Sequence, residues 1–219
     1  MSKLRKSVSV VVAVFTGSSA IAADPPTTPT PLYVGVGAGF DAMPDRNMNY
    51  TGFAVSSQWT SGWGALLAVG YRGPYGLRSE IEFSQRASRL RTFNNNIRWD
   101  GTQWDNSLMA NVLYDFRFGG PVVPYIGVGI GGTNISWGNN FRNPQEPSIY
   151  DHDSSHLGWQ GMVGASYDFN QKMELGLDFR VKGAPATYSF PGSQAGTSIN
   201  DFHYLTHSVF LTFRYGFNP

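Results

Sequence analysis

The 219-residue sequence predicts an all-β fold, an eight-stranded antiparallel transmembrane β-barrel with up-and-down meander order. Three observations support this prediction. The last ten-residue stretch alternates apolar and polar residues, similar alternation recurs about eight times, and the connections between these stretches alternate between short and long. A period of two is the pattern of a strand with two unlike faces, and about ten residues of tilted strand cross a bilayer.

Residues 1–23 have the features of a cleaved secretory signal peptide. Three basic residues precede an apolar run over 8–15, which is too short to span a bilayer, and small residues in an A-x-A pattern follow it. We predict cleavage after Ala22 or Ala23. The next segment, 24–31, is rich in Pro and Thr and is expected to be an extended leader that does not pack.

The composition excludes several other classes of protein. Without the signal peptide, 13 Lys and Arg remain against 15 Asp and Glu, a net charge of about −2, so no basic footprint for nucleic acid remains. Cysteine is absent, which excludes a disulfide scaffold and thiolate metal ligands. No stretch of the mature chain reaches the roughly 18 apolar residues of a membrane helix, which excludes a helical membrane protein.

Eight alternating stretches are predicted as strands, over 32–41, 63–72, 77–84, 108–118, 125–131, 157–169, 173–182 and 208–217. Short turns are predicted around Gly73, Gly119 and Asn170. Long polar connections are predicted over 43–62, 88–103, 136–155 and 184–200. Short and long connections therefore lie at opposite ends of the strands, which is typical of an outer-membrane barrel with short periplasmic turns and long outer loops.

The bulk of the apolar face predicts that it points outward, into lipid. The interior of an eight-stranded barrel has room only for closely packed side chains, and the apolar face is too bulky for it. The opposite face of the strands is rich in glycine and fits inside. This argues against the alternative of a soluble barrel that buries its apolar face. The outward aromatic residues form two belts, as expected at two membrane interfaces: Tyr71, Tyr114, Phe116, Tyr167, Phe169, Tyr215 and Phe217 near the short turns, and Phe40, Trp63, Phe83, Trp159 and Phe179 nearer the other rim.

If the apolar face points outward, the opposite face of the strands directs seven basic and six acidic side chains into the lumen. They are Arg72, Arg78, Glu80, Glu82, Arg86, Asp115, Arg117, Asp168, Glu174, Asp178, Arg180, Lys182 and Arg214. An unpaired buried charge costs several kcal/mol, so near balance in a narrow barrel predicts a paired network that plugs it. An open pore stays as the alternative.

The chain resembles the opacity-type, surface-antigen family of Gram-negative outer-membrane barrels, similar in architecture to the transmembrane domain of outer membrane protein A. The resemblance covers residues 32–217 and is carried by an ordered set of segments: Tyr33-Val-Gly-Val-Gly-Ala-Gly-Phe, Asn111-Val-Leu-Tyr-Asp-Phe, Pro124-Tyr-Ile-Gly-Val-Gly-Ile-Gly-Gly, Gly164-Ala-Ser-Tyr-Asp-Phe and His207-Ser-Val-Phe-Leu-Thr-Phe-Arg-Tyr-Gly-Phe. Asn218-Pro219 departs from the family pattern, in which many relatives end at the aromatic residue.

The resemblance implies an eight-stranded barrel that the barrel-assembly machinery inserts after reading an aromatic-ended terminal strand. The residues that match this signal are Val209, Leu211, Phe213, Tyr215 and Phe217. Similarity of fold does not establish function, because such barrels include adhesins, envelope anchors, small channels and lipid-modifying enzymes.

Two places in the sequence combine residue types that can carry chemistry. His207 and Ser208 are adjacent in a strand and point to opposite faces, so they cannot form a base and nucleophile pair. The run 151–156 combines carboxylates, imidazoles and hydroxyls, but its spacing matches no metal motif and a solvated loop is the simpler interpretation. The run 94–96 and several loop aromatics are candidates for surface recognition, with packing inside the loops as the simpler interpretation: Tyr50, Trp59, Trp99, Trp104, Trp137 and Phe141.

The sequence therefore predicts a non-enzymatic outer-membrane β-barrel protein of a Gram-negative bacterium, an envelope structural component or surface antigen with long outer loops and a charge-plugged lumen. A narrow porin-like channel and a lipid A-modifying enzyme are the alternatives. No catalytic, metal-binding or cofactor-binding residue is assigned. The expected partners are outer-membrane lipid and lipopolysaccharide, the barrel-assembly machinery and a host or surface ligand at the outer loops.

Overall fold

The structure, a computed structural model, describes residues 30–44, 46–50, 53–93, 97–137, 152–185, 188–189, 198–199 and 203–217. The predicted signal peptide, most of the leader, the run 94–96 and Asn218-Pro219 lie outside these residues. Among the described elements no helix is long and apolar enough to cross a membrane.

The described chain is built almost entirely from strands. In order they are β1 (Leu32–Ala42), β2 (Arg46–Tyr50), β3 (Phe53–Arg72), β4 (Leu77–Phe93), β5 (Ile97–Asp115), β6 (Val122–Trp137), β7 (His152–Asp168), β8 (Met173–Pro185), β9 (Tyr188–Ser189), β10 (Ser198–Ile199) and β11 (His203–Phe217). A single 3₁₀ turn, η1 (Pro74–Gly76), joins β3 to β4.

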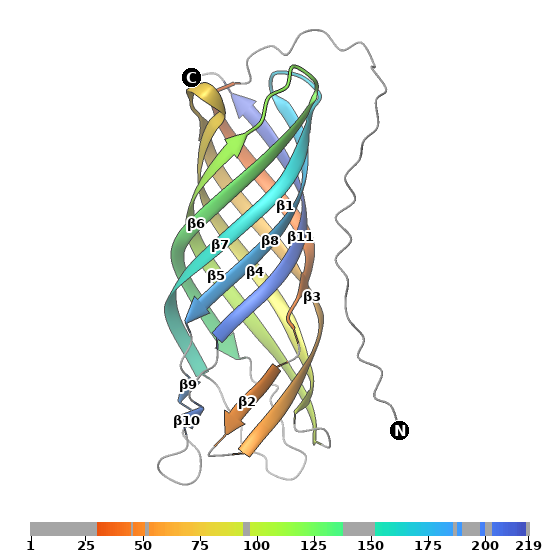
Figure 1. The fold of residues 1–219 in the computed structure, drawn as a ribbon, viewed down its shortest axis with the longest axis vertical. Helices are drawn as coiled ribbons and strands as arrows, with labels where there is room; N and C mark the ends of the chain where they lie inside the picture. The colour runs from red at the N-terminus through yellow and green to blue at the C-terminus, as the bar shows by residue number, and fades with distance from the viewer. Residues whose placement is uncertain are drawn as a thin grey trace.

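Eight of these strands close into an antiparallel barrel, which confirms the predicted fold (Figure 1). Neighbouring strands pair in sequence order from β3 to β8, β11 pairs with β8, and β1 closes the barrel by pairing with both β11 and β3. Strand β2 extends the sheet beside β3, and β9 pairs with β10. Closure leaves no open edge along the membrane-spanning part, so backbone hydrogen bonds are satisfied between strands.

Alternation along the strands places apolar side chains outside and polar side chains inside. On β11, Val209, Leu211 and Phe213 are 40–54% exposed, whereas the intervening Thr212 and Arg214 are 1% and 3% exposed. The outer surface of a barrel in a membrane is covered by lipid, so these exposed apolar residues form the membrane-facing surface.

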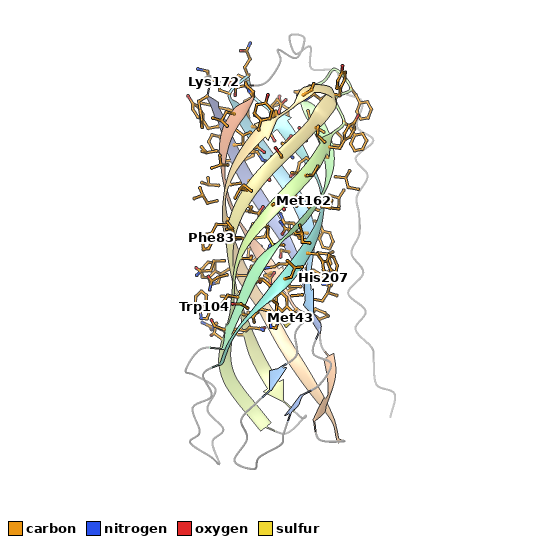
Figure 2. All side chains as sticks on the ribbon, turned by 90° about the vertical axis from the view of Figure 1, so that its left-hand side faces the viewer. Met43, Phe83, Trp104, Met162, Lys172 and His207 are labelled. Carbon is orange, nitrogen blue, oxygen red and sulfur yellow. The ribbon has the colours of Figure 1, made fainter. Side chains whose placement is uncertain are left out.

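The two predicted aromatic belts lie on this outer surface. Near the short turns Tyr114 contacts Phe116 edge to face, with ring centroids 4.9 Å apart, and Tyr167 contacts Phe169 at 5.1 Å. At the opposite end Trp63 contacts Trp104 at 5.8 Å. Figure 2 shows Lys172 at the short-turn end and Trp104 and His207 toward the opposite end.

The short turns depend on a few special backbone positions. Tyr75 and Gly76 adopt positive φ angles of 60° and 82° in η1, and Gly119 has φ 84° between β5 and β6. Asn170 closes the turn between β7 and β8, because its side-chain oxygen accepts hydrogen bonds from the backbone N–H groups of Lys172 and Met173.

The prediction of long irregular connections is wrong in its extent. Strand β4 continues to Phe93 and β5 begins at Ile97, so paired strand occupies most of the stretch predicted as a loop over 88–103. Strand β3 likewise begins at Phe53, ten residues before the predicted start. Pairing with neighbouring strands sustains these extensions, although their sequences lack the regular apolar alternation of the predicted strands. They carry the sheet beyond the length that a bilayer requires.

Candidate functional site

The lumen holds ten of the thirteen predicted charges as buried side chains: Arg78, Glu80, Glu82, Arg86, Asp115, Glu174, Asp178, Arg180, Lys182 and Arg214. Arg72 lies at the short-turn mouth with 9% of its side chain exposed. Arg117 and Asp168 pair with each other at the short-turn rim, at 3.0 Å, and are more exposed than the rest. The alternation of strand β5 ends at Asp115, which is why Arg117 lies beyond the lumen.

Glu174 is the centre of the ion pairs at the short-turn end. Its carboxylate lies 2.5 Å from both Arg72 and Arg214 and 3.6 Å from Arg78. The Arg78 guanidinium also approaches Asp115 at 3.3 Å and lies over the Tyr125 ring, 4.7 Å from its centroid. Three cations therefore share a small number of carboxylates in a space from which water is largely excluded, where each contact is stronger than at a surface.

The last residues before β1 cover the same end of the lumen. Thr30 is buried, and its backbone N–H donates to the Gln171 carbonyl at 3.1 Å. Arg72 donates from its side chain to the Thr30 carbonyl at 3.1 Å and from its backbone to the Pro31 carbonyl at 2.7 Å. The segment thus ties the start of β1 to the end of β3 and to the turn between β7 and β8.

Arg180 connects two carboxylates at the middle of the lumen. Its guanidinium donates to Glu82 at 2.5 Å and to Asp178 through a very short contact. Asp178 also accepts a hydrogen bond from the Tyr125 hydroxyl at 2.9 Å. The side-chain amide of Asn111 donates to Glu82 at 3.3 Å, so the carboxylate retains several donors after losing water.

Phe210 interrupts the polar lumen with a fully buried aromatic ring. Arg86 and Arg180 lie over this ring, 5.5 Å and 5.2 Å from its centroid, which is favourable because the ring face is electron-rich. A side-chain carbon at Gly64 would lie 2.6 Å from the ring, so glycine is needed there. Phe210 is the one residue of the terminal strand that breaks the apolar alternation, and its position between two arginines explains it.

Lys182 and Asp105 form the centre of the polar contacts at the loop end. The Lys182 ammonium lies 2.7 Å from Asp105 and donates to the Ser107 hydroxyl at 2.7 Å and to the Thr133 hydroxyl at 3.0 Å. The Tyr204 hydroxyl donates at 2.8 Å to Asp105 Oδ2, which also accepts a hydrogen bond from Lys182. All three donors of the ammonium have nearby acceptors, as a buried lysine requires.

Asp41 accepts hydrogen bonds from three hydroxyls beside this cluster. Ser208 donates at 2.6 Å, Thr206 at 2.7 Å and Ser88 at 3.0 Å. Arg86 lies between the two carboxylates, 3.7 Å from Asp41 and 3.6 Å from Asp105. The polar contacts thus continue from the short-turn mouth to the loop end of the barrel.

Two lumen carboxylates, Asp41 and Asp105, are absent from the predicted set. Asp41 is in phase with the inward glycines of β1, which could have revealed it. Asp105 lies two residues before the inward Ser107, but the strand was predicted to begin only at 108. Tyr33 and Tyr125 share the phase of the inward glycines of β1 and β6, and both are buried in the lumen as that phase predicts.

The inward glycines make room for long lumen side chains, as predicted. At Gly127 an added Cβ would lie 2.7 Å from Leu113 and 2.9 Å from Met162. At Gly129 it would collide with Asn111, and at Gly70 with the Tyr33 ring. These contacts explain why glycine alternates with β-branched residues in strands rather than lying in a loop.

The structure describes the candidate pair His207 and Ser208, whereas the side chains of 151–154, the run 94–96 and the loop aromatics other than Trp104 lie outside the described residues. His207 stacks on Phe179 at 6.0 Å on the outer face, whereas Ser208 is buried in the lumen and bonded to Asp41, so the two are separated as expected. Within the described part of the chain no cluster of three or more His, Cys, Asp or Glu could hold a metal ion. The residues matching the assembly signal all lie on the outward face of β11, but their role as a signal stays a prediction.

Several solved outer-membrane proteins resemble this barrel. The crystal structure of OprG from Pseudomonas aeruginosa matches with a TM-score of 0.58 and 10% identity over 88% of this chain and 99% of its own. That of Neisserial surface protein A matches with a TM-score of 0.53 and 16% identity over 85% and 97%. The solid-state NMR structure of AlkL in lipid bilayers matches with a TM-score of 0.50 and 14% identity over 93% and 98%. At such identities the likeness shows the fold alone.

The sequence comparisons agree with the architecture. No curated protein sequence matches the chain at a significant level. Residues 9–217 match a family model described as the outer membrane protein β-barrel domain, which covers nearly the whole chain. With its closed eight-stranded meander and its lipid-facing apolar surface, the chain belongs to the outer membrane protein β-barrel domain family.

Proposed function

We propose that this protein is a non-catalytic envelope component or surface antigen whose lumen is closed by its own ion pairs. One observation carries the proposal: buried, paired charges occupy the lumen from Arg72 and Glu174 at one end to Asp105 and Lys182 at the other. Water and ions need space and accessible polar surface to pass, and a lumen whose charged side chains are buried in ion pairs offers little of either. The strand extensions beyond the membrane would form the surface that meets the environment.

Planar bilayers test the closed lumen directly. We expect the folded, inserted protein to give no steady single-channel conductance, because the guanidinium of Arg180 and the ring of Phe210 fill the middle of the barrel. A porin reconstituted in the same way is the positive control, and heat-modifiability on a detergent gel establishes that the barrel is folded. Large, steady conductance from the wild-type protein would replace the proposal with a narrow channel.

The non-catalytic part rests on the inaccessibility of the candidate nucleophiles. Ser107 contacts Lys182, but the two residues are 2% and 0% exposed, and Lys182 is held by Asp105. A serine nucleophile must reach substrate and a free base, and neither is available here. We therefore expect mass spectra of lipid A to be the same from cells with and without the gene. An acyl pattern that changed with the gene, and reverted in a Ser107→Ala strain, would establish an enzyme.

A further inference from the structure

Four polar side chains form a continuous row on the outer face of the barrel, across strands β4 to β7. The register pairs Gln85 with Asn106, Asn106 with Asn134, and Asn134 with Ser155. All four are in phase with outward residues of their strands, such as Phe83 and Leu108. We name these four residues the amide row.

Hydrogen bonds join the row in two halves and leave its centre open. The Gln85 amide donates to the Asn106 oxygen at 2.8 Å, and the Asn134 amide donates to the Ser155 hydroxyl at 3.2 Å. These two bonds orient both asparagines. The Asn106 amide N–H₂ and the Asn134 amide oxygen make no side-chain hydrogen bond to any described residue, so neighbouring strands present one donor and one acceptor side by side.

The position of the row relates it to the membrane surface. The next row toward the short turns is Phe83, Leu108, Gly132 and Leu157, which belongs to the apolar surface. On the other side of the amide row lies the Trp63 and Trp104 pair, and Figure 2 shows Trp104 nearer the loop end than Phe83. Indole rings favour the interface between acyl chains and headgroups. The amide row therefore lies at headgroup level on the outer-loop side.

The chemistry of the row suits neutral hydroxyl groups. None of its members carries a charge, so it lacks the cations that bind phosphate strongly. A hydroxyl both donates and accepts, and it can satisfy the open amide donor and acceptor together. The outer leaflet on the loop side of such a barrel is made of lipopolysaccharide, whose sugars lie directly above its acyl chains.

We propose that the amide row binds the sugar backbone of lipopolysaccharide, with Asn106 and Asn134 at its centre. The inference rests on the outer-membrane location in the proposed function but not on the closed lumen. Conductance through the wild-type barrel would therefore overturn the closed lumen and leave this site intact.

Lipid retention measured by native mass spectrometry tests the site. The mature full-length barrel is placed in nanodiscs of phosphatidylethanolamine and phosphatidylglycerol with added lipid A, then released into detergent. In Asn106→Leu/Asn134→Leu we expect lipid A to bind roughly tenfold more weakly than in the wild type, since two hydrogen bonds are lost. Phosphatidylglycerol binding should not change. Ser79 is an outward polar residue at the short-turn end of β4. Ser79→Leu is therefore the matched control, and this variant should bind lipid A like the wild type.

Heat-modifiability shows whether each variant is folded, and Asn106→Ala/Asn134→Ala carries the same prediction if the leucine pair does not fold. Equal lipid A binding by the wild type and a folded double variant would overturn the proposal. So would a parallel loss of phosphatidylglycerol, which would indicate a general effect on surrounding lipid, or an equal loss in Ser79→Leu.

Discussion

Arg180→Met is expected to lower the free energy of unfolding by about 3–5 kcal/mol, because it leaves two buried carboxylates without their shared cation. Glu82 and Asp178 are at most 2% exposed and both bind the Arg180 guanidinium. The substitution also removes one of the two cations that lie over the Phe210 ring. Urea unfolding of the barrel in lipid vesicles, followed by tryptophan fluorescence, measures the change.

Two further variants separate loss of charge pairing from loss of packing. Arg117→Met removes a more exposed arginine of the rim pair and should cost less than about 1 kcal/mol. Adding Glu82→Gln and Asp178→Asn to Arg180→Met should restore most of the lost stability, since no buried charge is then unpaired. Equal losses for Arg117→Met and Arg180→Met would show that the lumen charges are hydrated and would contradict the closed lumen.

Gly127→Leu is expected to destabilise the barrel by about 1–3 kcal/mol or more through overpacking. Gly127 faces Leu113 across the β5–β6 pair and Met162 across the β6–β7 pair, and both side chains occupy the space that a larger residue would need. Leu113→Gly alone should also lower the free energy of unfolding, by about 2–5 kcal/mol, because it leaves a cavity. The same unfolding measurement in vesicles applies to both variants.

The exchanged double variant Leu113→Gly/Gly127→Leu tests whether volume is the cause. It keeps the two side chains of the pair and swaps their strands, so we expect it to recover much of the stability that either single variant loses. Gly132→Leu is the control, because nothing lies within 4 Å of a Cβ on its outward face. A double variant as unstable as the sum of the two singles would refute complementary packing at this position.

The faces of the strands could be predicted from sequence because alternation is a local property of extended backbone. Val209, Leu211 and Phe213 point outward for the same reason that Thr212 and Arg214 point inward. The inward position of the glycines could also be predicted, because the lumen of a narrow barrel has limited volume. Strand ends could not be predicted in the same way. The extensions of β4 and β5 lack regular apolar alternation in sequence, and their pairing depends on neighbouring strands.

A period of two and the limited lumen volume are enough to predict, from the amino-acid order, a membrane barrel with apolar residues outside and charges inside. Which charges meet depends on the folded barrel. Glu82 and Arg180 are 98 residues apart in sequence, and their contact depends on the register and stagger of the closed sheet. The same register aligns Gln85, Asn106, Asn134 and Ser155 from four strands into one row, which no local pattern encodes.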